Sequence, residues 1–280
     1  MESKRLFLSK KHHNKEEKKT EPQKDLTLLS QQKLTKYNLN ELYLKLTPLE
    51  NLIGLKPVSN YMNFQNEINE KMRLILIDWI ISIHNDFKFL DRTLYQTVWI
   101  IDTFLSLNSI KVSKLQLVGA TSLLISCKFN EFQCPKIETI VALSGNAFTS
   151  EDLLLMEVKI LKDINYNLII PTLDEFYNII SNFFNFNQEE FLLGKFFMES
   201  SILNYEFIRY SISDIILGCA FIVLVIIENK KNICHFKKNT KDIAKKIYIF
   251  VENLENMVNI NAVDEKHSKE KYYLKIKGIF

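Results

Sequence analysis

The chain has 280 residues, 47% of them hydrophobic, and this length corresponds to about two domains of ordinary size. Its 6 glycines and 5 prolines fall far below the roughly 12% that the pair contributes to an average chain. This scarcity argues against sandwiches, barrels and Rossmann folds and predicts an all-α protein. The 36 basic and 33 acidic side chains leave a net charge of +3, which does not indicate a dedicated nucleic-acid-binding protein.

Residues 1–32 are polar and rich in lysine and glutamate, with too few apolar residues to fold alone, so we expect a disordered tail. This tail has no apolar stretch of the secretory type. The 4 cysteines form no CxxC pair and no histidine cluster completes a zinc set, so we expect free thiols, no metal and no cofactor. The expected location is the nucleus and cytoplasm.

Residues 33–65 are predicted to form a short helix, Leu39–Leu46, that ends near Pro48, and a connecting segment. Pro171 then divides the rest of the chain into two parts, residues 66–170 and 171–280. Helices of the first part are predicted at Asn66–Phe87, Arg92–Leu107, Ser113–Phe129, Lys136–Leu143 and Ser150–Ile164. Helices of the second part are predicted at Thr172–Phe184, Glu189–Asn204, Ser213–Glu228 and Lys241–Met257, followed by a weaker basic segment.

These patterns are simplest to describe as two tandem units of five helices. The longest apolar run, Ile215 to Ile227, is shorter than the roughly 20 residues that span a bilayer, so we expect a buried helix and no membrane partner. The stretch from Ser113 to Phe129 carries no charge between Lys114 and Lys128. It is therefore the best candidate for a central helix of the first unit.

The first helix of that unit is apolar almost all round. One stripe contains Leu74, Ile77 and Ile81 with Ile80 at its edge, and a second stripe contains Met72, Ile75, Leu76 and Trp79. Periodicity alone favours a central core helix, since apolar stripes usually face a core. The alternative is that the second stripe forms an exposed docking groove for apolar anchors of a peptide.

Four blocks in order carry a family resemblance: MRLILIDW from Met72, IIDTFLS from Ile100, KLQLVGATSLLISCKFNE from Lys114 and LLLMEVKILKDINYNL from Leu153. Together they resemble the cyclin box of A/B-type mitotic cyclins. The resemblance is strong from Tyr61 to Pro171 and weak in the second half. It implies two tandem five-helix cyclin folds, an N-terminal cyclin box at residues 66–170 and a C-terminal cyclin fold at 171–280.

The resemblance also assigns roles to single residues. The five signature positions of the box fall on Arg73, Asp102, Leu117, Lys128 and Glu157. Arg73 and Asp102 resemble a partly buried pair that ties the first helix to the second. Lys128 and Glu157 resemble polar anchors that grip a cyclin-dependent kinase, although Glu157 could also be an ordinary surface acid. Around them, positions that supply apolar area against the kinase are Phe129, Leu161, Tyr166 and Leu168, with Tyr166 in place of the usual Phe.

The second stripe matches the docking patch through which the family recruits substrates and inhibitors with an Arg-x-Leu motif. Its residues are Met72, Ile75, Leu76, Trp79, Leu115 and Gln116. The two acidic positions that hold the basic residue of the motif are here Ser82 and Gly145, with Asp86 as a partial substitute. We therefore expect a weaker preference for a basic residue.

The string from Arg5 to Leu8 fits the minimal Arg-x-x-Leu degradation motif of mitotic cyclins, which would make a ubiquitin ligase a further partner. A chance match of two fixed residues is an equally good interpretation. Type A or type B stays open, and the pair Lys128-Phe129 leans to A.

The resemblance implies a non-catalytic regulatory subunit that binds and activates a cyclin-dependent kinase in G2/M control and helps to recruit substrates. The alternative is a transcription-type cyclin or a cyclin-fold transcription adaptor. A nucleic-acid partner is not expected from the near-neutral charge. An enzyme is the rival from another class, but no catalytic set of residues can be recognised, and His84 and His235 lack motif partners.

Overall fold

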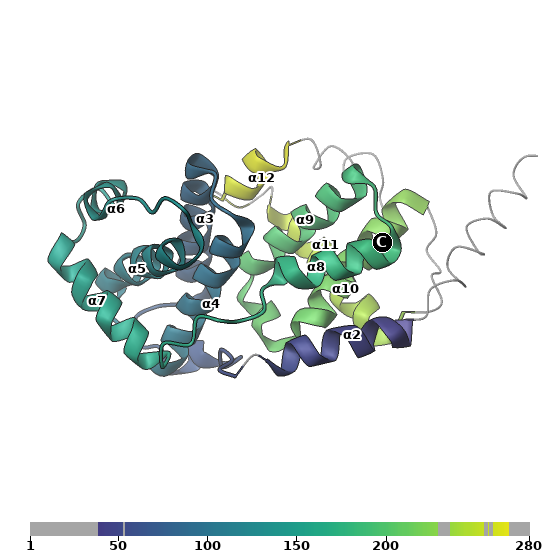
Figure 1. Ribbon diagram of the computed structural model, residues 1–280, viewed down its shortest axis with the longest axis horizontal. Coiled ribbons are helices and arrows are strands. Elements are labelled where there is room, and N and C mark those ends of the chain that lie inside the picture. The colour runs from purple at the N-terminus through teal and green to yellow at the C-terminus, as the bar shows by residue number, and fades with distance from the viewer. Residues whose placement is uncertain (1–38, 53, 229–235, 255–256, 258–259, 269–280) are drawn as a thin grey trace, which may run out of the picture. The chain divides into compact units, whose positions relative to one another are not determined.

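The computed structural model describes residues 39–52, 54–228, 236–254, 257 and 260–268. The predicted tail of residues 1–32 and the string from Arg5 to Leu8 lie outside these residues. Over the described ranges the elements are α-helices and two short 3-10 helices, with no strand (Figure 1). The expected all-α fold is confirmed.

The N-terminal bundle is built around one buried helix, as the sequence predicted. Its helices are α3 (Glu70–Phe87), α4 (Asp91–Leu107), α5 (Val112–Asn130), α6 (Ile137–Leu143) and α7 (Ser150–Asp163). The side chains of α5 are buried from Leu117 to Cys127, and α5 contacts the other four helices. At Gly119 an added Cβ would lie 2.6 Å from Leu76 Cδ1, so glycine allows α3 to approach α5 closely.

The C-terminal bundle repeats this plan around the apolar run noted in the sequence. Its helices are α8 (Leu173–Phe184), α9 (Gln188–Leu203), α10 (Ile212–Glu228), α11 (Lys238–Leu254) and α12 (Ala262–Lys266), with a 3-10 helix η2 (Tyr205–Arg209). Side chains from Ile215 to Ile226 are buried, and α10 contacts α8, α9 and α11. The run is therefore the core of this bundle. Among the described helices, none is long and apolar enough to cross a membrane.

Helix α2 (Leu39–Asn51) continues past Pro48, so the prediction that it ends there was wrong. Proline inside a helix removes one hydrogen bond and crowds the carbonyl four residues earlier, that of Leu44. Because Leu44 is 74% exposed, water can hydrate this carbonyl and the helix runs on. Leu42 and Leu46 are buried, and α2 contacts α8 and α10. A 3-10 helix η1 (Tyr61–Phe64) follows in the connecting segment.

Local capping residues fix the ends of several helices. Helix α3 was predicted to begin at Asn66 but begins at Glu70, because the Asn69 side chain accepts a hydrogen bond from Met72 N at 3.0 Å and caps the helix there. Thr149 and Asp152 form a reciprocal capping box at the start of α7. Side-chain chemistry in the sequence thus sets these boundaries more sharply than hydrophobic periodicity does.

Candidate functional site

Lys128 and Glu157 meet on the surface of the N-terminal bundle. Lys128 lies in the last turn of α5, where the helix dipole favours a cation, and Glu157 lies in the middle of α7. Lys128 Nζ donates hydrogen bonds to both carboxylate oxygens of Glu157, at 2.6 and 2.8 Å. The Lys128 side chain is 45% exposed and that of Glu157 only 13% exposed. The pair is therefore a partly exposed ion pair on the surface of the bundle.

Polar contacts bring the segment that follows α7 against the end of α5. Gln96 on α4 donates to the carbonyl of Leu168 at 2.7 Å and accepts from Asn130 Nδ2 at 2.5 Å. The chain from α7 onward is held by the hydrogen bond from Tyr166 N to the carbonyl of Leu161, at 2.8 Å. As a result, the residues assigned to the kinase interface lie on adjoining elements and not at scattered sites.

Apolar side chains on these elements are exposed to solvent. Phe129 is 46% and Tyr166 63% exposed, while Leu161 and Leu168 are partly buried. Sequence reasoning missed five further exposed apolar residues on the same elements: Leu154, Leu155, Val158, Phe132 and Ile169. These exposed apolar side chains make this face of the N-terminal bundle a candidate interaction site.

A signal for part of the missed set was present in the sequence. Leu154, Val158 and Leu161 recur at spacings of four and three residues, which places them on one face of α7 beside Glu157. The complete exposure of Phe132 depends on the loop after α5. Glu131 anchors that loop, since its carboxylate accepts hydrogen bonds from Leu90 N at 2.8 Å and Thr93 Oγ1 at 2.5 Å.

The six residues of the predicted docking patch lie where α3 packs on α5, but they differ in exposure. Ile75 is 46% exposed, and Met72, Trp79 and Gln116 are partly exposed. Leu76 and Leu115 are buried, at 5% and 7% exposure. The second stripe of α3 is therefore partly surface and partly core. Neither a fully buried core helix nor a fully exposed docking groove, the two interpretations left open by periodicity, describes it.

Trp79 belongs to both the surface part and the core part of this stripe, because its side chain is only partly exposed. Its side chain packs on the core cluster that includes Leu117, Ala120 and Leu124. Ser82 and Asp86 are exposed, and Gly145 is exposed with a left-handed φ of 69°. Asp86 is therefore an acidic group accessible on the helix that carries most of the patch.

Arg73 and Asp102 form a buried pair that reaches beyond the N-terminal bundle. Arg73 Nε and Nη2 donate to the two Asp102 oxygens, each at 2.7 Å, and Arg73 Nη1 donates to the carbonyls of Ile202 and Leu203, at 3.0 and 3.1 Å. Tyr61 Oη donates to Asp102 Oδ1 at 2.8 Å. Both charged residues are buried, at 1% and 4% exposure, and not partly buried as expected.

The electrostatics of this pair follow from its surroundings. Burial acts to lower the pKa of Arg73, but the charge of Asp102 and its hydrogen bonds outweigh burial and raise that pKa above its ordinary value. The Tyr61 hydroxyl is likewise held neutral, because burial and the Asp102 charge raise its pKa. The carbonyls of Ile202 and Leu203 end α9, so one guanidinium joins α3, α4 and α9.

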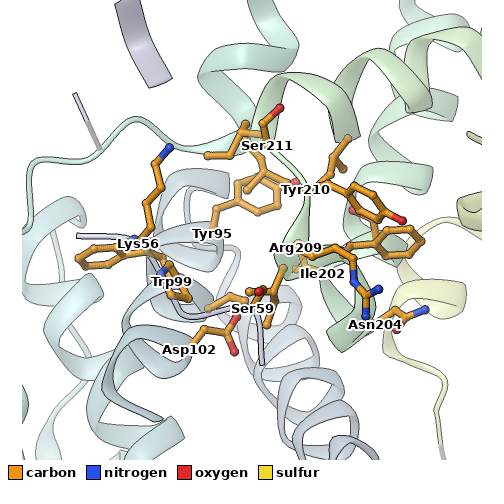
Figure 2. Close-up of a pocket in the computed structure, with 18 of the residues that line it drawn as sticks. Lys56, Ser59, Tyr95, Trp99, Asp102, Ile202, Asn204, Arg209, Tyr210 and Ser211 are labelled. Carbon is orange, nitrogen blue, oxygen red and sulfur yellow. The ribbon is translucent and has the colours of Figure 1, made fainter. Parts of the chain in front are cut away.

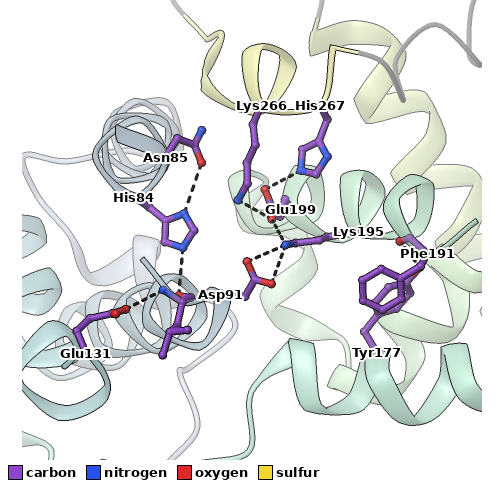
Figure 3. A network of polar contacts seen from close by, with 11 residues as sticks. His84, Asn85, Asp91, Glu131, Tyr177, Phe191, Lys195, Glu199, Lys266 and His267 are labelled. Atoms are coloured by element: carbon purple, nitrogen blue, oxygen red, sulfur yellow. Dashed lines mark hydrogen bonds and ion pairs between the residues drawn. The ribbon is translucent and has the colours of Figure 1, made fainter. Parts of the chain in front are cut away.

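A second buried network, not foreseen from the sequence, surrounds Glu199 on α9 (Figure 3). Lys266 Nζ donates to Glu199 Oε1 at 2.8 Å, and His267 Nε2 lies 2.9 Å from Oε2. Lys195 donates to both oxygens of Asp91 at 2.7 Å. Burial alone would raise the pKa of Glu199, but the hydrogen bond from His267 and the charge of Lys266 lower it to about 2.

His84 has a structural place beside this network. Its Nε2 lies 3.1 Å from the carbonyl of Leu90, and burial followed by the charge of Lys266 lowers its pKa. In the part of the chain that the structure describes, no three metal-ligating side chains come together.

Family comparison accounts for both bundles. The model of the cyclin N-terminal domain matches residues 41–169, and the model of the cyclin C-terminal domain matches residues 171–277. A viral cyclin from Herpesvirus saimiri has a similar structure, with a TM-score of 0.58 at 18% identity over 85% of this chain and 99% of its own. The yeast CTDK-1 kinase complex contains a chain with a TM-score of 0.56 at 14% identity, over 71% of this chain and 76% of that one. These two likenesses concern the fold alone.

Sequence comparison with curated relatives shows which type of cyclin the chain is similar to. The G2/mitotic-specific cyclin-B of Hydra vulgaris is 33% identical over 255 residues, which cover 89% of this chain and 70% of that protein. Cyclin-B2 of Anguilla japonica is 32% identical over 84% of this chain and 59% of its own length. Cyclin-B2-1 of Oryza sativa is 38% identical over 61% of this chain and 40% of its own length.

These relatives are all of type B, so the lean of Lys128-Phe129 towards type A was misleading. They also do not favour the alternative of a transcription-type cyclin. Two domain matches that together span most of the chain, and a relative matched over most of its own length, agree with the resemblance that the four sequence blocks carry. The chain therefore belongs to the cyclin family, with relatives among the G2/mitotic cyclins of type B.

Proposed function

We propose that this cyclin is the regulatory subunit of a cyclin-dependent kinase, which it binds and activates in G2/M control. The observation that carries the proposal is the apolar surface around the Lys128–Glu157 pair, on the elements where cyclins of this type contact the kinase. It is a non-catalytic subunit. Its location in nucleus and cytoplasm is part of the same proposal.

The Lys128–Glu157 pair can stay intact in the complex. An ammonium group has three N–H donors, and Glu157 uses two of those of Lys128, so one remains for a backbone carbonyl of the kinase. Each carboxylate oxygen of Glu157 has further lone pairs that can accept backbone N–H groups. Such charge-assisted hydrogen bonds fix the register of an interface whose area is mainly apolar.

Activation then follows from differential affinity. A kinase that exchanges between inactive and active conformers shifts to the active one when the cyclin binds that conformer more tightly. The rigid α5 and α7 present a preformed surface, so little ordering cost is expected on the cyclin side. The C-terminal bundle contributes by stabilising the N-terminal one through Arg73.

The test is a pull-down with a cyclin-dependent kinase, combined with a histone kinase assay. The double variant Lys128→Ala, Glu157→Ala should lose binding by about 30-fold or more, as for removal of a hot spot of about 2 kcal/mol, and activation with it. A control is Lys246→Ala, Glu206→Ala, which removes from the C-terminal bundle an ion pair whose lysine is equally exposed, at 45%. If both double variants bind and activate like the parent chain, the assigned interface is wrong.

Substrate recruitment is proposed for the exposed half of the docking patch, Met72, Ile75, Trp79 and Gln116, above the buried Leu76 and Leu115. The partners would be substrates or inhibitors with Arg-x-Leu-type motifs. Because Ser82 and Gly145 carry no charge, Asp86 is the proposed partial substitute that interacts with the basic residue of such a motif. A ubiquitin ligase is a further proposed partner, through the string from Arg5 to Leu8.

A further inference from the structure

A cavity of about 500 Å³ lies between the two bundles, and its lining includes no residue of the proposed kinase interface or docking patch (Figure 2). Val98 and Trp99 of α4 form part of its wall on the N-terminal side. Phe207 of η2 and Ile212 and Ile215 of α10 form part of its wall on the C-terminal side. This volume is within the roughly 300–1,000 Å³ of typical small-molecule sites, which also favour such junctions.

The interior of this cavity suits an apolar body. Aliphatic and aromatic side chains supply most of its surface, beside polar residues such as Ser201 and Asn204, and Trp99 and Ile212 are partly exposed there. Arg73 and Asp102 lie among the lining residues, but they are bonded to each other, and Arg73 also donates to two carbonyls of α9. Their charges are therefore already compensated, so a ligand group beside them gains little from being charged.

The rim of the cavity differs from its interior because it carries uncompensated positive charge. Lys56 and Arg209 line the cavity and are exposed, and neither forms an ion pair with any residue that the structure describes. The acidic residue at the rim, Glu50, has an oxygen that accepts from Ser213 N at 2.9 Å. Figure 2 shows Lys56 near Trp99 on one side and Arg209 near Tyr210 on the other. Cations outnumber carboxylates at the rim, which favours an anion there.

We propose that this cavity binds a small organic anion with an aromatic body, the rings against Trp99 and the isoleucines and the anionic group at the rim. Such a ligand would touch α4 of one bundle and η2 and α10 of the other. Because it binds the paired bundles and not the unfolded chain, it would stabilise their association. The proposal is independent of kinase binding.

The chain has two tryptophans, Trp79 and Trp99, so Trp79→Phe leaves Trp99 as a single reporter in the cavity wall. The probe is 1-anilinonaphthalene-8-sulfonate, an aromatic anion that accepts energy from tryptophan, titrated into the full chain with this substitution. We expect saturable quenching of Trp99 emission. The uncharged N-phenyl-1-naphthylamine should bind at least about fivefold more weakly, as expected for loss of about 1 kcal/mol of charge-assisted interaction.

The preference for the anion should vanish when Lys56→Gln and Arg209→Gln are added. A matched control, Lys45→Gln with Lys88→Gln, removes two exposed cations that do not line the cavity and should leave the preference intact. Trp99 emission that the anionic probe leaves unchanged overturns the proposal. Equal binding of the two probes, or binding that is indifferent to Lys56 and Arg209, overturns it as well.

Discussion

Arg73 shows how one residue can join elements distant in sequence. Its guanidinium is fully buried and uses its donors on a carboxylate of α4 and two carbonyls that end α9. A buried cation is tolerated when protein acceptors replace its water, and here Arg73 donates four hydrogen bonds to a carboxylate and two carbonyls. The sequence resemblance predicted the pairing with Asp102. It could not predict Ile202 and Leu203, because backbone carbonyls leave no trace in residue identity.

Glu199 gives a prediction at this scale. Its pKa in the folded chain is about 2, below the ordinary carboxyl value. As the pH falls, the unfolded chain therefore binds more protons than the folded chain does. The stability that Glu199 contributes is present above the ordinary carboxyl pKa and is lost as the pH falls towards 2. Between pH 5 and pH 3, the free energy of unfolding should therefore fall more steeply for the parent chain than for Glu199→Gln.

Urea unfolding at a series of pH values measures this slope. Glu190→Gln is a control of the same chemistry, because Glu190 lies on the same helix but only partly buried at its capping box. Parallel pH dependences for the parent chain and Glu199→Gln would contradict the assigned role of the Glu199 network.

At the scale of elements, the positions of the helices along the chain were largely predictable from the sequence. Which faces of a helix are buried and which are exposed was not. Caps and breaks such as Thr149 and Pro171 mark boundaries in local chemistry, so α7 and α8 begin at or one residue from their predicted starts. Pro48 misled, because its crowding falls on the exposed turn of α2 that contains Leu44. The two apolar stripes of α3 could not be assigned to core or surface, since their exposure is decided by the helices that pack on α3, among them α5, α9 and α12.

Ile75 and Trp79 lie on the same stripe of α3 but differ in exposure, so their alanine variants should differ in their effects on peptide binding and on stability. Ile75→Ala removes a side chain that is 46% exposed, so binding of an Arg-x-Leu peptide should weaken while the unfolding midpoint stays nearly unchanged. Trp79→Ala also leaves a cavity beside the core cluster, and should lower the free energy of unfolding by on the order of 3 kcal/mol. Peptide titration and urea unfolding of both variants check this.

Histone phosphorylation without a docking motif is the accompanying control and should be spared in Ile75→Ala. Peptide affinity that survives Ile75→Ala unchanged would exclude Ile75 from the docking patch.

At the scale of the whole molecule, polar contacts join the two bundles at several points. Arg73 reaches the end of α9, Lys195 of α9 reaches Asp91 of α4, and Asp78 of α3 accepts hydrogen bonds from Asn261 N and Ala262 N at the start of α12. The tandem arrangement was predictable from two apolar helices separated by Pro171. Its polar junction was not, since each pair joins residues about 100 or more positions apart.

The proposed kinase interface was predictable only in part for the same reason. Lys128, Glu157 and Phe129 came from the family resemblance, which fixes positions along the chain. The spacing of Val158 places it beside Glu157 on α7, but the complete exposure of Phe132 depends on the loop after α5, and only the folded chain displays it. These two residues enlarge the apolar surface that the resemblance alone assigned.

The kinase affinity of Val158→Asp, compared with Ile249→Asp, tests the central claim most directly. Both side chains are exposed on helices, at 49% and 43%, so a charge at either position should leave folding intact, as circular dichroism can verify. Val158→Asp should weaken kinase binding by about 30-fold or more and reduce histone phosphorylation equally, because it buries a charge in an apolar interface. Ile249→Asp, on α11, should bind and activate like the parent chain. A folded Val158→Asp that binds and activates equally well would show that the kinase docks elsewhere.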